Sequence, residues 1–553
     1  MKHLSRARLH AAVVALWAGA PTAALAQGDI VARWVQYAPG SSPSVTPPGW
    51  GDAPANPTST VLLRAVVTDA SSCPSASLDH SSPLTLRSRF VGDNGTPNSL
   101  THTPGSPGAL NGQPGYPQYF VSNTVPSSLA DGGQKATTQW GECEAVVPPG
   151  HQIVTIEGVD LKLPVAHPQR ILVMGDTGCR LEAGTAGNAG MARNCQSPAA
   201  FPLNYLAQFE ATFRPDVIIH VGDYSRRDAN CLAGDAALES GCASATGAGF
   251  ANGGDTFDTW NADFLSPAKT LLATAPWIML RGNDESCGRG ARGWYALLDP
   301  FPYNYDRVVC RRTAIYPAPH ASGATYNGDF EPSYAVRLGG VNFIVHDSSF
   351  ASDDPADLDW AENSDIDLTA MLATLRETSP GAPAIFLSHK PTFNRSHADA
   401  GACDAGHGAP GDENAANGDA IFAGNLSLQA VFSGITGRMG TAFSDGIPSN
   451  IALFLSGHVH QFRYLNIGTG DAVNAQFAPQ LIVGTGGGLE GCAATPGLTD
   501  IFDHDGFGFA VLDAITDSAQ TVTGYTAAIY KISTALAGRC TIQFNPRSIS
   551  CRF

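Results

Sequence analysis

Beyond residue 26 the sequence contains no unbroken apolar stretch of about 18 residues, the length that indicates a membrane-spanning helix. Basic residues are also few, with 32 Lys and Arg against 49 Asp and Glu and a formal net charge of −17. An acidic surface disfavours nucleic acid and anionic membranes as partners. It does not exclude a small anionic ligand, because bound cations can dominate the field inside a pocket. We therefore expect no membrane span and no nucleic acid partner.

The first residues have the pattern of a secretory signal. Three basic residues lie within the first eight, an apolar core follows at 11–20, and small residues at 24–26 fit a cleavage site. We predict that residues 1–26 are a signal peptide and that the protein is exported, to the periplasm or out of the cell. The segment contains no acidic residue, so its removal changes the net charge from −17 to −20.

Cys-x-x-Cys pairs are absent, although the chain has 12 cysteines. Their absence disfavours thiolate metal ligation, and cysteines of exported proteins usually pair as disulfides. Local spacing suggests five pairs and leaves a sixth by elimination. The expected pairs are Cys73–Cys143, Cys179–Cys195, Cys231–Cys242, Cys287–Cys310, Cys540–Cys551 and, by elimination, Cys403–Cys492.

The chain divides into two regions with different patterns. Residues 27–165 contain short strand-like runs between long Pro-, Ser- and Gly-rich stretches and lack helical periodicity, which predicts an all-β, fibronectin-III-like sandwich domain. From 169 to 553 strands alternate with helices, so we predict an α/β catalytic domain. The segment 334–349 is typical of a hairpin that turns at Gly339-Gly340. Helices are expected at 201–213, 255–275, 367–380 and around 419–437.

Five polar motifs each follow an apolar run that is typical of a buried strand. They are Gly-Asp-Thr-Gly at 175–178, Gly-Asp-Tyr at 222–224, Gly-Asn-Asp-Glu at 282–285, Ser-His-Lys-Pro at 388–391 and Gly-His-Val-His at 457–460. Ligands gather at the carboxyl ends of parallel strands, so we expect these motifs to meet at one edge of a sheet. Two Asp, one Asn and three His at one edge predict a two-metal hydrolytic site.

Each ligand candidate has an expected place. Asp176 binds the first ion, and Asp223 bridges both. Asn283, His389 and His458 bind the second ion, while His460 returns to the first; the expected ligands are thus Asp176, Asp223, Asn283, His389, His458 and His460. Oxygen and imidazole donors suit two Fe, Mn or Zn ions. The chemistry we infer is attack of metal-bound hydroxide on a phosphate ester.

The ordered motifs Gly-Asp-Thr-Gly, Gly-Asp-Tyr, Gly-Asn-Asp-Glu, Ser-His and Gly-His-Val-His resemble those of calcineurin-like metallophosphoesterases. The Asp-x-Gly opening and the preceding β region are most similar to purple acid phosphatases. The resemblance covers about 169 to 515 and implies a two-layer β-sandwich flanked by helices, with a di-metal centre. It also matches the Gly-rich turn at 484–491, which follows the last core strand.

Two departures from the family pattern concern the first ion. Purple acid phosphatases have a metal-binding Tyr three residues after the bridging Asp, where this chain has Arg226. Many relatives have Asp-x-His in the first motif, where this chain has Gly178. Tyr224 directly follows the bridging Asp and should point away from the ions. We therefore expect weaker binding of the first ion, and no tyrosinate–iron colour.

A third departure concerns catalysis. The family His that contacts phosphate and protonates the leaving group is Asp284 here. Asp284 can act as an acid only if burial keeps it protonated, and its carboxylate form repels an anionic ester. We expect slower turnover, or a preference for diesters or activated leaving groups. Asp223 and Asp284 are the candidate catalytic residues.

These patterns predict a secreted di-metal phosphohydrolase that acts on a small phosphate ester. A phosphodiesterase, or a catalytically impaired metal- or phosphate-binding protein, is the alternative, because Asp284 replaces the family His. Arg226 and His397 are the candidate substrate contacts. His220 and His346 lie inside strand runs and are expected to be core histidines.

Overall fold

The structure is a computed structural model. It describes residues 29–40, 59–68, 73–88, 141–182, 191–195, 197–227, 257–286, 289–300, 331–352, 358–393, 424–433, 448–465, 478–486, 507–532 and 535–552. The predicted signal peptide lies outside these residues. No helix within the described ranges combines the length and the apolar character needed to cross a membrane.

One layer of the fold is an 11-stranded sheet with the order β23-β22-β21-β20-β9-β12-β13-β1-β2-β6-β5. Its strands are β1 Ile30–Ala38, β2 Thr60–Val67, β5 Arg87–Ser88, β6 Gly141–Val146, β9 Arg170–Met174, β12 Val217–His220, β13 Trp277–Met279, β20 Gly508–Thr516, β21 Val522–Lys531, β22 Leu536–Phe544 and β23 Arg547–Arg552. Strands β9, β12, β13 and β1 run parallel, and the outer strands on both sides are antiparallel.

The second layer is a six-stranded sheet with the order β14-β15-β16-β17-β19-β18. Its strands are β14 Tyr334–Leu338, β15 Val341–Val345, β16 Ala384–Leu387, β17 Ile451–Ser456, β18 Phe462–Leu465 and β19 Gln480–Val483. Strands β15, β16, β17 and β19 are parallel. The expected hairpin is confirmed, since β14 and β15 pair around Gly339 and Gly340, whose φ angles of 57° and 90° suit a tight two-residue turn.

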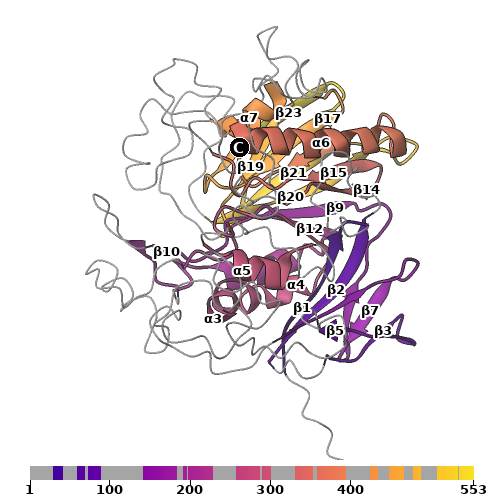
Figure 1. Ribbon diagram of the computed structural model, residues 1–553, viewed down its shortest axis with the longest axis vertical. Helices are drawn as coiled ribbons and strands as arrows, with labels where there is room; N and C mark the ends of the chain where they lie inside the picture. Colours follow the sequence, from indigo (N-terminus) through magenta and orange to yellow (C-terminus); the bar gives the residue numbers. More distant parts are fainter. Residues whose placement is uncertain are drawn as a thin grey trace, which may run out of the picture.

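Helices cover the outer faces of the two large sheets (Figure 1). They are α1 Leu203–Ala211, α3 Phe257–Trp260, the π-helix η3 Asn261–Leu265, α4 Lys269–Leu272, α5 Ala291–Gly293, the π-helix η4 Trp294–Leu298, α6 Leu358–Thr378 and α7 Leu426–Ser433. The helix expected at 255–275 is split into α3, η3 and α4. Pro267 accounts for the break before α4, because it lacks an N–H and clashes with the preceding turn.

Alternation along the central strands builds two cores. Ile171 and Val173 of β9 pack in the core between the two large sheets, whereas Leu172 and Met174 pack against α1, η3 and α4. In β12, Ile219 likewise packs between the two sheets, whereas Ile218 packs on the side of the helices. A strand that is buried on both faces needs an unbroken apolar run, as these strands have. The α/β fold with a two-layer sandwich flanked by helices is therefore confirmed.

The strands before residue 165 are distributed over two sheets. β1, β2, β5 and β6 extend the 11-stranded sheet, and β1 joins β13 where Gln36 aligns with Trp277. The remainder form a four-stranded sheet of β3 Ala76–Leu78, β4 Ser82–Leu84, β7 Ile153–Ile156 and β8 Val159–Lys162. A small ladder of β10 Leu181–Glu182 and β11 Met191–Ala192 follows β9. A domain boundary near 165 stays a prediction, and the large sheet continues across it.

Candidate metal centre

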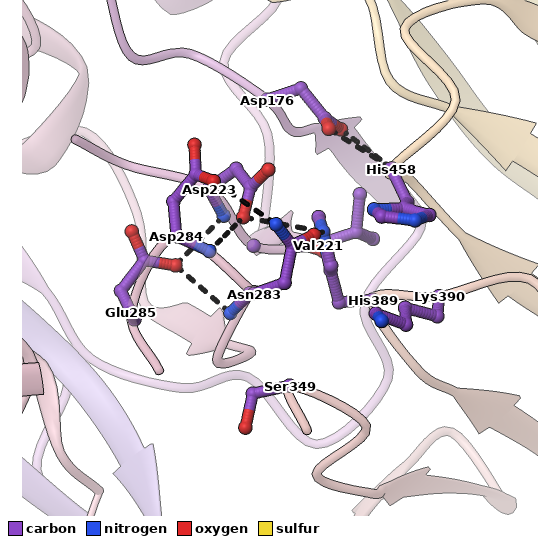
Figure 2. A network of polar contacts seen from close by, with 12 residues as sticks. Asp176, Val221, Asp223, Asn283, Asp284, Glu285, Ser349, His389, Lys390 and His458 are labelled. Carbon is purple, nitrogen blue, oxygen red and sulfur yellow. Dashed lines mark hydrogen bonds and ion pairs between the residues drawn. The ribbon is translucent and has the colours of Figure 1, made fainter. Parts of the chain in front are cut away.

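The predicted site residues meet where the central strands of both large sheets end. Asp176 follows β9, Asp223 follows β12, Asn283 follows β13, and the histidines follow β16 and β17. Figure 2 shows Asp223, Asn283, His389 and His458 beside one another, with Asp176 next to His458. Parallel strands deliver their carboxyl ends to one edge, so residues far apart in the chain come together there.

Two groups of potential ligands share one carboxylate. In one group, ligand atoms of Asp223, His389 and His458 all lie within 4.8 Å of one another. In the other, ligand atoms of Asp176, Asp223 and His460 do so. Asp223 is thus placed between two clusters, as the sequence led us to expect of a bridging carboxylate.

The cluster around His389 has a fourth donor. Asn283 Oδ1 lies 2.9 Å from His389 Nε2, and Asp223 Oδ1 lies 3.3 Å from the same nitrogen. His389 Nδ1 lies 2.7 Å from the Val221 carbonyl oxygen, to which its N–H donates. That bond fixes the orientation of the ring and points Nε2 towards Asn283 and Asp223, as an outer hydrogen bond commonly does for a metal-binding histidine.

The cluster around Asp176 is tied to both sheets. The Asp176 backbone N–H donates to the Gly222 carbonyl at 2.8 Å, which joins the loops after β9 and β12. The His458 backbone N–H donates to both Asp176 carboxylate oxygens, at 3.0 and 3.1 Å. His460 Nε2 lies 3.4 Å from Asp176 Oδ1. The two sheets therefore meet at one buried carboxylate.

Four of these residues have a left-handed backbone. The φ angles are 55° for Asp176, 60° for Asp223, 75° for His458 and 50° for His460. Non-glycine residues rarely adopt this conformation, and such strain tends to concentrate at functional sites. The sharp turns project both histidines of the last motif into the site within three residues.

The motif glycines leave room for the ligands. A Cβ atom on Gly457 would overlap Asp176 Oδ2, and one on Gly282 would overlap Asp223 Oδ1. A Cβ on Gly222 would meet the His389 ring, and one on Gly484 would lie 2.8 Å from Asp176 Oδ2. The expected Gly-rich turn therefore begins beside the site, although its residues 487–491 lie outside the described residues.

Glu285 supports the site from behind. Its buried carboxylate accepts backbone N–H groups from Gly282, Asp223, Tyr224 and Ser225, at 2.9, 3.0, 2.8 and 3.3 Å respectively. Burial, with the nearby Asp223 charge, raises the pKa of Glu285 to about 7. Glu285 received no role in the sequence analysis, although it belongs to the Gly-Asn-Asp-Glu motif. The only sequence feature that pointed to it was its position two residues after a ligand Asn.

Asp284 lies between two arginines and is fully buried. Arg226 Nε is 2.8 Å from its Oδ2, and Arg289 forms a second ion pair with its Oδ1. The Asn283 side-chain amide also donates to Oδ1, at 3.1 Å. These partners stabilise the carboxylate form, which weakens the case for Asp284 as a proton donor. Sequence reasoning missed Arg289, which carried no recognisable signal.

The protonation of the cluster follows from its charges. Burial raises the pKa of Asp223, but His389 and Arg226 reverse this and hold it well below its usual value. Burial lowers the pKa of His389, but Asp223 outweighs this and raises it to about 9. Burial and the charge of His389 keep the pKa of His458 well below its usual value. Cation binding would replace the His389 proton, as it does at most imidazole sites.

Three other predicted residues lie outside the cluster. His220 is buried, accepts the Gly222 N–H at Nδ1 and bonds Thr177 Oγ1 through Nε2 at 3.0 Å. His346 bonds two serine hydroxyls, and burial lowers its pKa to about 4. Tyr224 stacks on His220 with ring centroids 3.9 Å apart, away from the ligands. Both core-histidine predictions are confirmed. His397 lies outside the described residues.

Three predicted disulfides are confirmed: Cys73–Cys143, Cys179–Cys195 and Cys540–Cys551. The second anchors the loop that follows Asp176. The remaining predicted pairs, Cys231–Cys242, Cys287–Cys310 and Cys403–Cys492, fall outside the described residues.

The donor set fits two metal ions. One end offers a carboxylate, an amide oxygen and two imidazoles, and the other offers two carboxylates and one imidazole. Carboxylate and imidazole donors without sulfur suit Fe, Mn or Zn. The glycines that clear space around these atoms support the same conclusion, because a Cβ there would fill the ligand positions.

Several solved structures are similar to this chain. Among curated proteins no sequence matches this chain. A purple acid phosphatase, PPD1 from yellow lupin (Lupinus luteus), is similar with a TM-score of 0.43 and 13% identity over 88% of this chain and 72% of that chain. The structure of PhoD is similar with a TM-score of 0.45 and 11% identity, over 95% of this chain and 92% of that chain. A dimetal phosphatase from Danio rerio is similar with a TM-score of 0.30 and 13% identity, over 68% of this chain and 99% of that chain.

The family model supplies the assignment. The Metallophos model, described as calcineurin-like phosphoesterase, matches residues 169–462, which is more than half of the chain. That range begins just before β9 and ends just after His460, so it contains every residue of both ligand clusters. The chain therefore belongs to the calcineurin-like phosphoesterase family.

Proposed function

We propose that this chain is an exported, di-metal hydrolase of phosphate esters. The observation that carries the proposal is the pair of ligand clusters that share Asp223. A shared carboxylate holds two ions close enough to act on one phosphoryl group. The predicted signal peptide and the three disulfides support export.

Asp223, His389 and His458 would hold one ion, and Asp176, Asp223 and His460 the other. The two ions would supply a water molecule of lowered pKa as the nucleophile and would neutralise charge on the phosphoryl oxygens. The chain itself supplies orientation. The Val221 carbonyl and the Asn283 amide oxygen fix the His389 ring. The Asp176 carboxylate accepts the His458 backbone N–H and so fixes the turn at His458. Glu285 holds the loop of Asp223 against the loop of Gly282. Asp223, His389 and His458 are thereby positioned before an ion or a substrate arrives, and such preorganisation speeds a reaction between bound groups.

The leaving group receives little help from Asp284. Its carboxylate is ion-paired with Arg226 and Arg289, so the proton that a poor leaving group needs is not readily available there. We propose that esters with activated leaving groups, such as aryl phosphates, are hydrolysed much faster than alkyl esters. The two arginines support binding of a phosphate anion near the site, because guanidinium groups pair well with phosphate oxygens.

The test is metal-dependent hydrolysis by the full chain. Chelation should abolish hydrolysis of an aryl phosphate, and Mn²⁺, Zn²⁺ or Fe²⁺ should restore it. His389→Ala should reduce kcat/KM by about 100-fold or more, because it removes a ligand from the shared cluster. His151→Ala is the matched control: His151 lies on the surface, paired with Asp79, and its loss should leave kcat/KM unchanged.

The alternative of a metal- or phosphate-binding protein gives a different result. In that case the chain would bind ions at both clusters but hydrolyse neither mono- nor diesters with any of the three metals. That outcome would contradict the proposed activity. A mono- versus diester comparison in the same assay distinguishes a phosphatase from a phosphodiesterase.

A further inference from the structure

The Arg226 guanidinium occupies the end of the site formed by Asp176, Asp223 and His460. Arg226 Nη1 lies 3.0 Å from His460 Nδ1 and 2.5 Å from His460 Nε2. The same His460 Nε2 lies 3.4 Å from Asp176 Oδ1. Arg226 is only 7% exposed, so its charge is enclosed with these groups. A cationic side chain therefore lies within contact distance of a candidate metal-binding nitrogen.

The Arg226 guanidinium lies against the His460 ring, since one of its nitrogens is within 3.0 Å of both ring nitrogens. A guanidinium at 2.5 Å from His460 Nε2 also takes the volume that an ion on that nitrogen would need. Like charges repel strongly in a buried setting, where water screens little. Arg226 and an ion at this end therefore exclude each other.

The surrounding chain fits Arg226 in this place. A Cβ on Gly178 would lie 2.6 Å from the Arg226 backbone nitrogen and 2.8 Å from its Cγ. A side chain at position 178 would thus displace Arg226, and glycine leaves that space open. On the other side Asp284 holds Arg226 Nε at 2.8 Å. The lack of a side chain at Gly178 thus leaves room for Arg226, and the ion pair with Asp284 holds Arg226 in that position.

The other end of the site differs. Asp223, His389 and His458 are joined there by Asn283, whose Oδ1 lies 2.9 Å from His389 Nε2. Four donors converge at that end, against three at the end that Arg226 enters. The two ends should consequently differ in affinity for the same ion.

We propose that Arg226 is a resident cation that competes with metal for the Asp176–Asp223–His460 end, and that Asp284 is the positioning residue that holds it there. The Asp223–Asn283–His389–His458 end then fills first, and the second ion binds only when Arg226 is displaced. The inference rests on the metal site of the proposed function, but not on turnover.

The experiment measures metal binding by the full, metal-stripped chain. Equilibrium dialysis against buffered free Mn²⁺ with metal counting gives both dissociation constants, and Mn²⁺ electron paramagnetic resonance separates isolated ions from coupled pairs. The unaltered chain should bind one ion tightly and a second with a Kd at least about tenfold higher. Arg226→Gln should lower the second Kd about tenfold or more and leave the first within about twofold.

Arg337→Gln is the matched control, because it removes the same charge from the exposed side of β14, where Arg337 bonds Ser379. It should change neither Kd. Equal changes in both variants would overturn the proposal by showing a general charge effect. So would two equally tight ions in the unaltered chain, a measurement that needs no variant. Neither result depends on hydrolysis, so an inactive chain would leave this inference standing.

The role of Asp284 has its own readout. In an Asp284→Asn background, Arg226→Gln should improve the second Kd by a smaller factor, because Arg226 is no longer held against His460. An unchanged factor would overturn the positioning role of Asp284. The first Kd, which reports on the opposite end of the site, shows in each variant that the protein is folded.

Discussion

At the scale of single residues, the glycines of the motifs are as necessary as the ligands. Gly457 and Gly282 each lie so close to a site carboxylate that any side chain would overlap it. The left-handed Asp and His residues of the motifs make the chain turn within one or two residues. A motif such as Gly-His-Val-His therefore combines metal-binding groups with the clearance that lets them approach.

Gly457→Ala should abolish metal loading at the Asp176 end and reduce kcat/KM by about 100-fold. Its Cβ would overlap Asp176 Oδ2 and lie 2.8 Å from Val221 Cγ2, so the carboxylate must move. Gly340→Ala is the control: it has φ of 90° and no atom within 4 Å of the added Cβ. It should lower the free energy of unfolding by about 1 kcal/mol and leave activity intact. Metal counting and steady-state kinetics check both, and full activity in Gly457→Ala would contradict the steric account.

Glu285→Ala should reduce the free energy of unfolding by about 3 kcal/mol or more. The substitution leaves four buried backbone N–H groups without their acceptor, including those of Asp223 and Gly282. Urea denaturation measures the change. Glu157→Ala serves for comparison, because Glu157 accepts one N–H, from Ser75, in an exposed setting. Equal losses in the two variants would show that the loops do not depend on Glu285.

The sequence predicted which side chains come to the site, but not how charged neighbours arrange themselves around them. Ligand residues follow apolar strand runs, so strand topology alone brings Asp223 and His389 together. The pairing of Asp284 with Arg226 and Arg289 depends on loop paths and side-chain reach, which no periodicity encodes. Glu285 was missed for the same reason, since its partners are backbone groups.

At the scale of elements, helix α1 buries a carboxyl group within an apolar core. Glu210 is 0% exposed, and neither of its oxygens has a hydrogen-bond partner in the part of the chain that the structure describes. The other buried residues of α1, Leu203, Leu206 and Ala207, belong to an apolar core cluster. Burial raises the pKa of Glu210 to about 8. The group is therefore neutral in the folded protein up to about neutral pH.

The raised pKa predicts a pH-dependent stability. Glu210 keeps its proton when folded but loses it near pH 4.3 when unfolded, so its contribution to stability falls as pH rises from about 4.5 to about 8. The loss approaches about 1.4 kcal/mol per pH unit within that window. Glu210→Gln should remove the dependence. The difference in unfolding free energy between the unaltered chain and the variant, measured at pH 5 and pH 8, checks it.

Glu377→Gln on the exposed face of α6 is the control for that measurement. Its difference from the unaltered chain should not change with pH. A flat difference for Glu210→Gln as well would show that Glu210 is solvated or paired in solution.

Most elements were predictable because their apolar spacing is regular. The strands at 171–174, 217–221, 384–387 and 451–455 appear within one residue of the expected runs. Helix α6 begins at Leu358, nine residues before the expected start, because its first turns carry few apolar residues. Its early part, rich in acidic residues, does not show the period of an amphipathic helix. The π-helix η3 could not be predicted, since no sequence pattern specifies it.

At the scale of the whole molecule, the strands before residue 165 are bound to the α/β part of the chain by a buried polar network. Arg64 pairs with Glu144 at 2.6 Å, and it donates to the Leu297 carbonyl at 3.0 Å and the Asp299 carbonyl at 2.5 Å. Trp34 packs in the same core as the helices beside β12. From the sequence we expected a separate β domain at 27–165. The pattern of apolar residues identifies a strand, but it does not reveal which sheet that strand joins.

A chain that begins at residue 166 should fail to fold. It would expose the β13 edge and the core around Trp277, which β1 covers. The protein lacking only residues 1–26 should unfold in one calorimetric transition. Solubility, circular dichroism and calorimetry of both forms check this. A soluble, cooperatively folding fragment that binds metal would instead establish an independent domain boundary near 165.

The left-handed turns at Asp176, Asp223, His458 and His460 have a further consequence. Each such residue costs about 1 kcal/mol or more in folding free energy, a burden that ordinary backbone would avoid. Four such conformations side by side together cost about 4 kcal/mol or more, which the packing and hydrogen bonds around the site must offset.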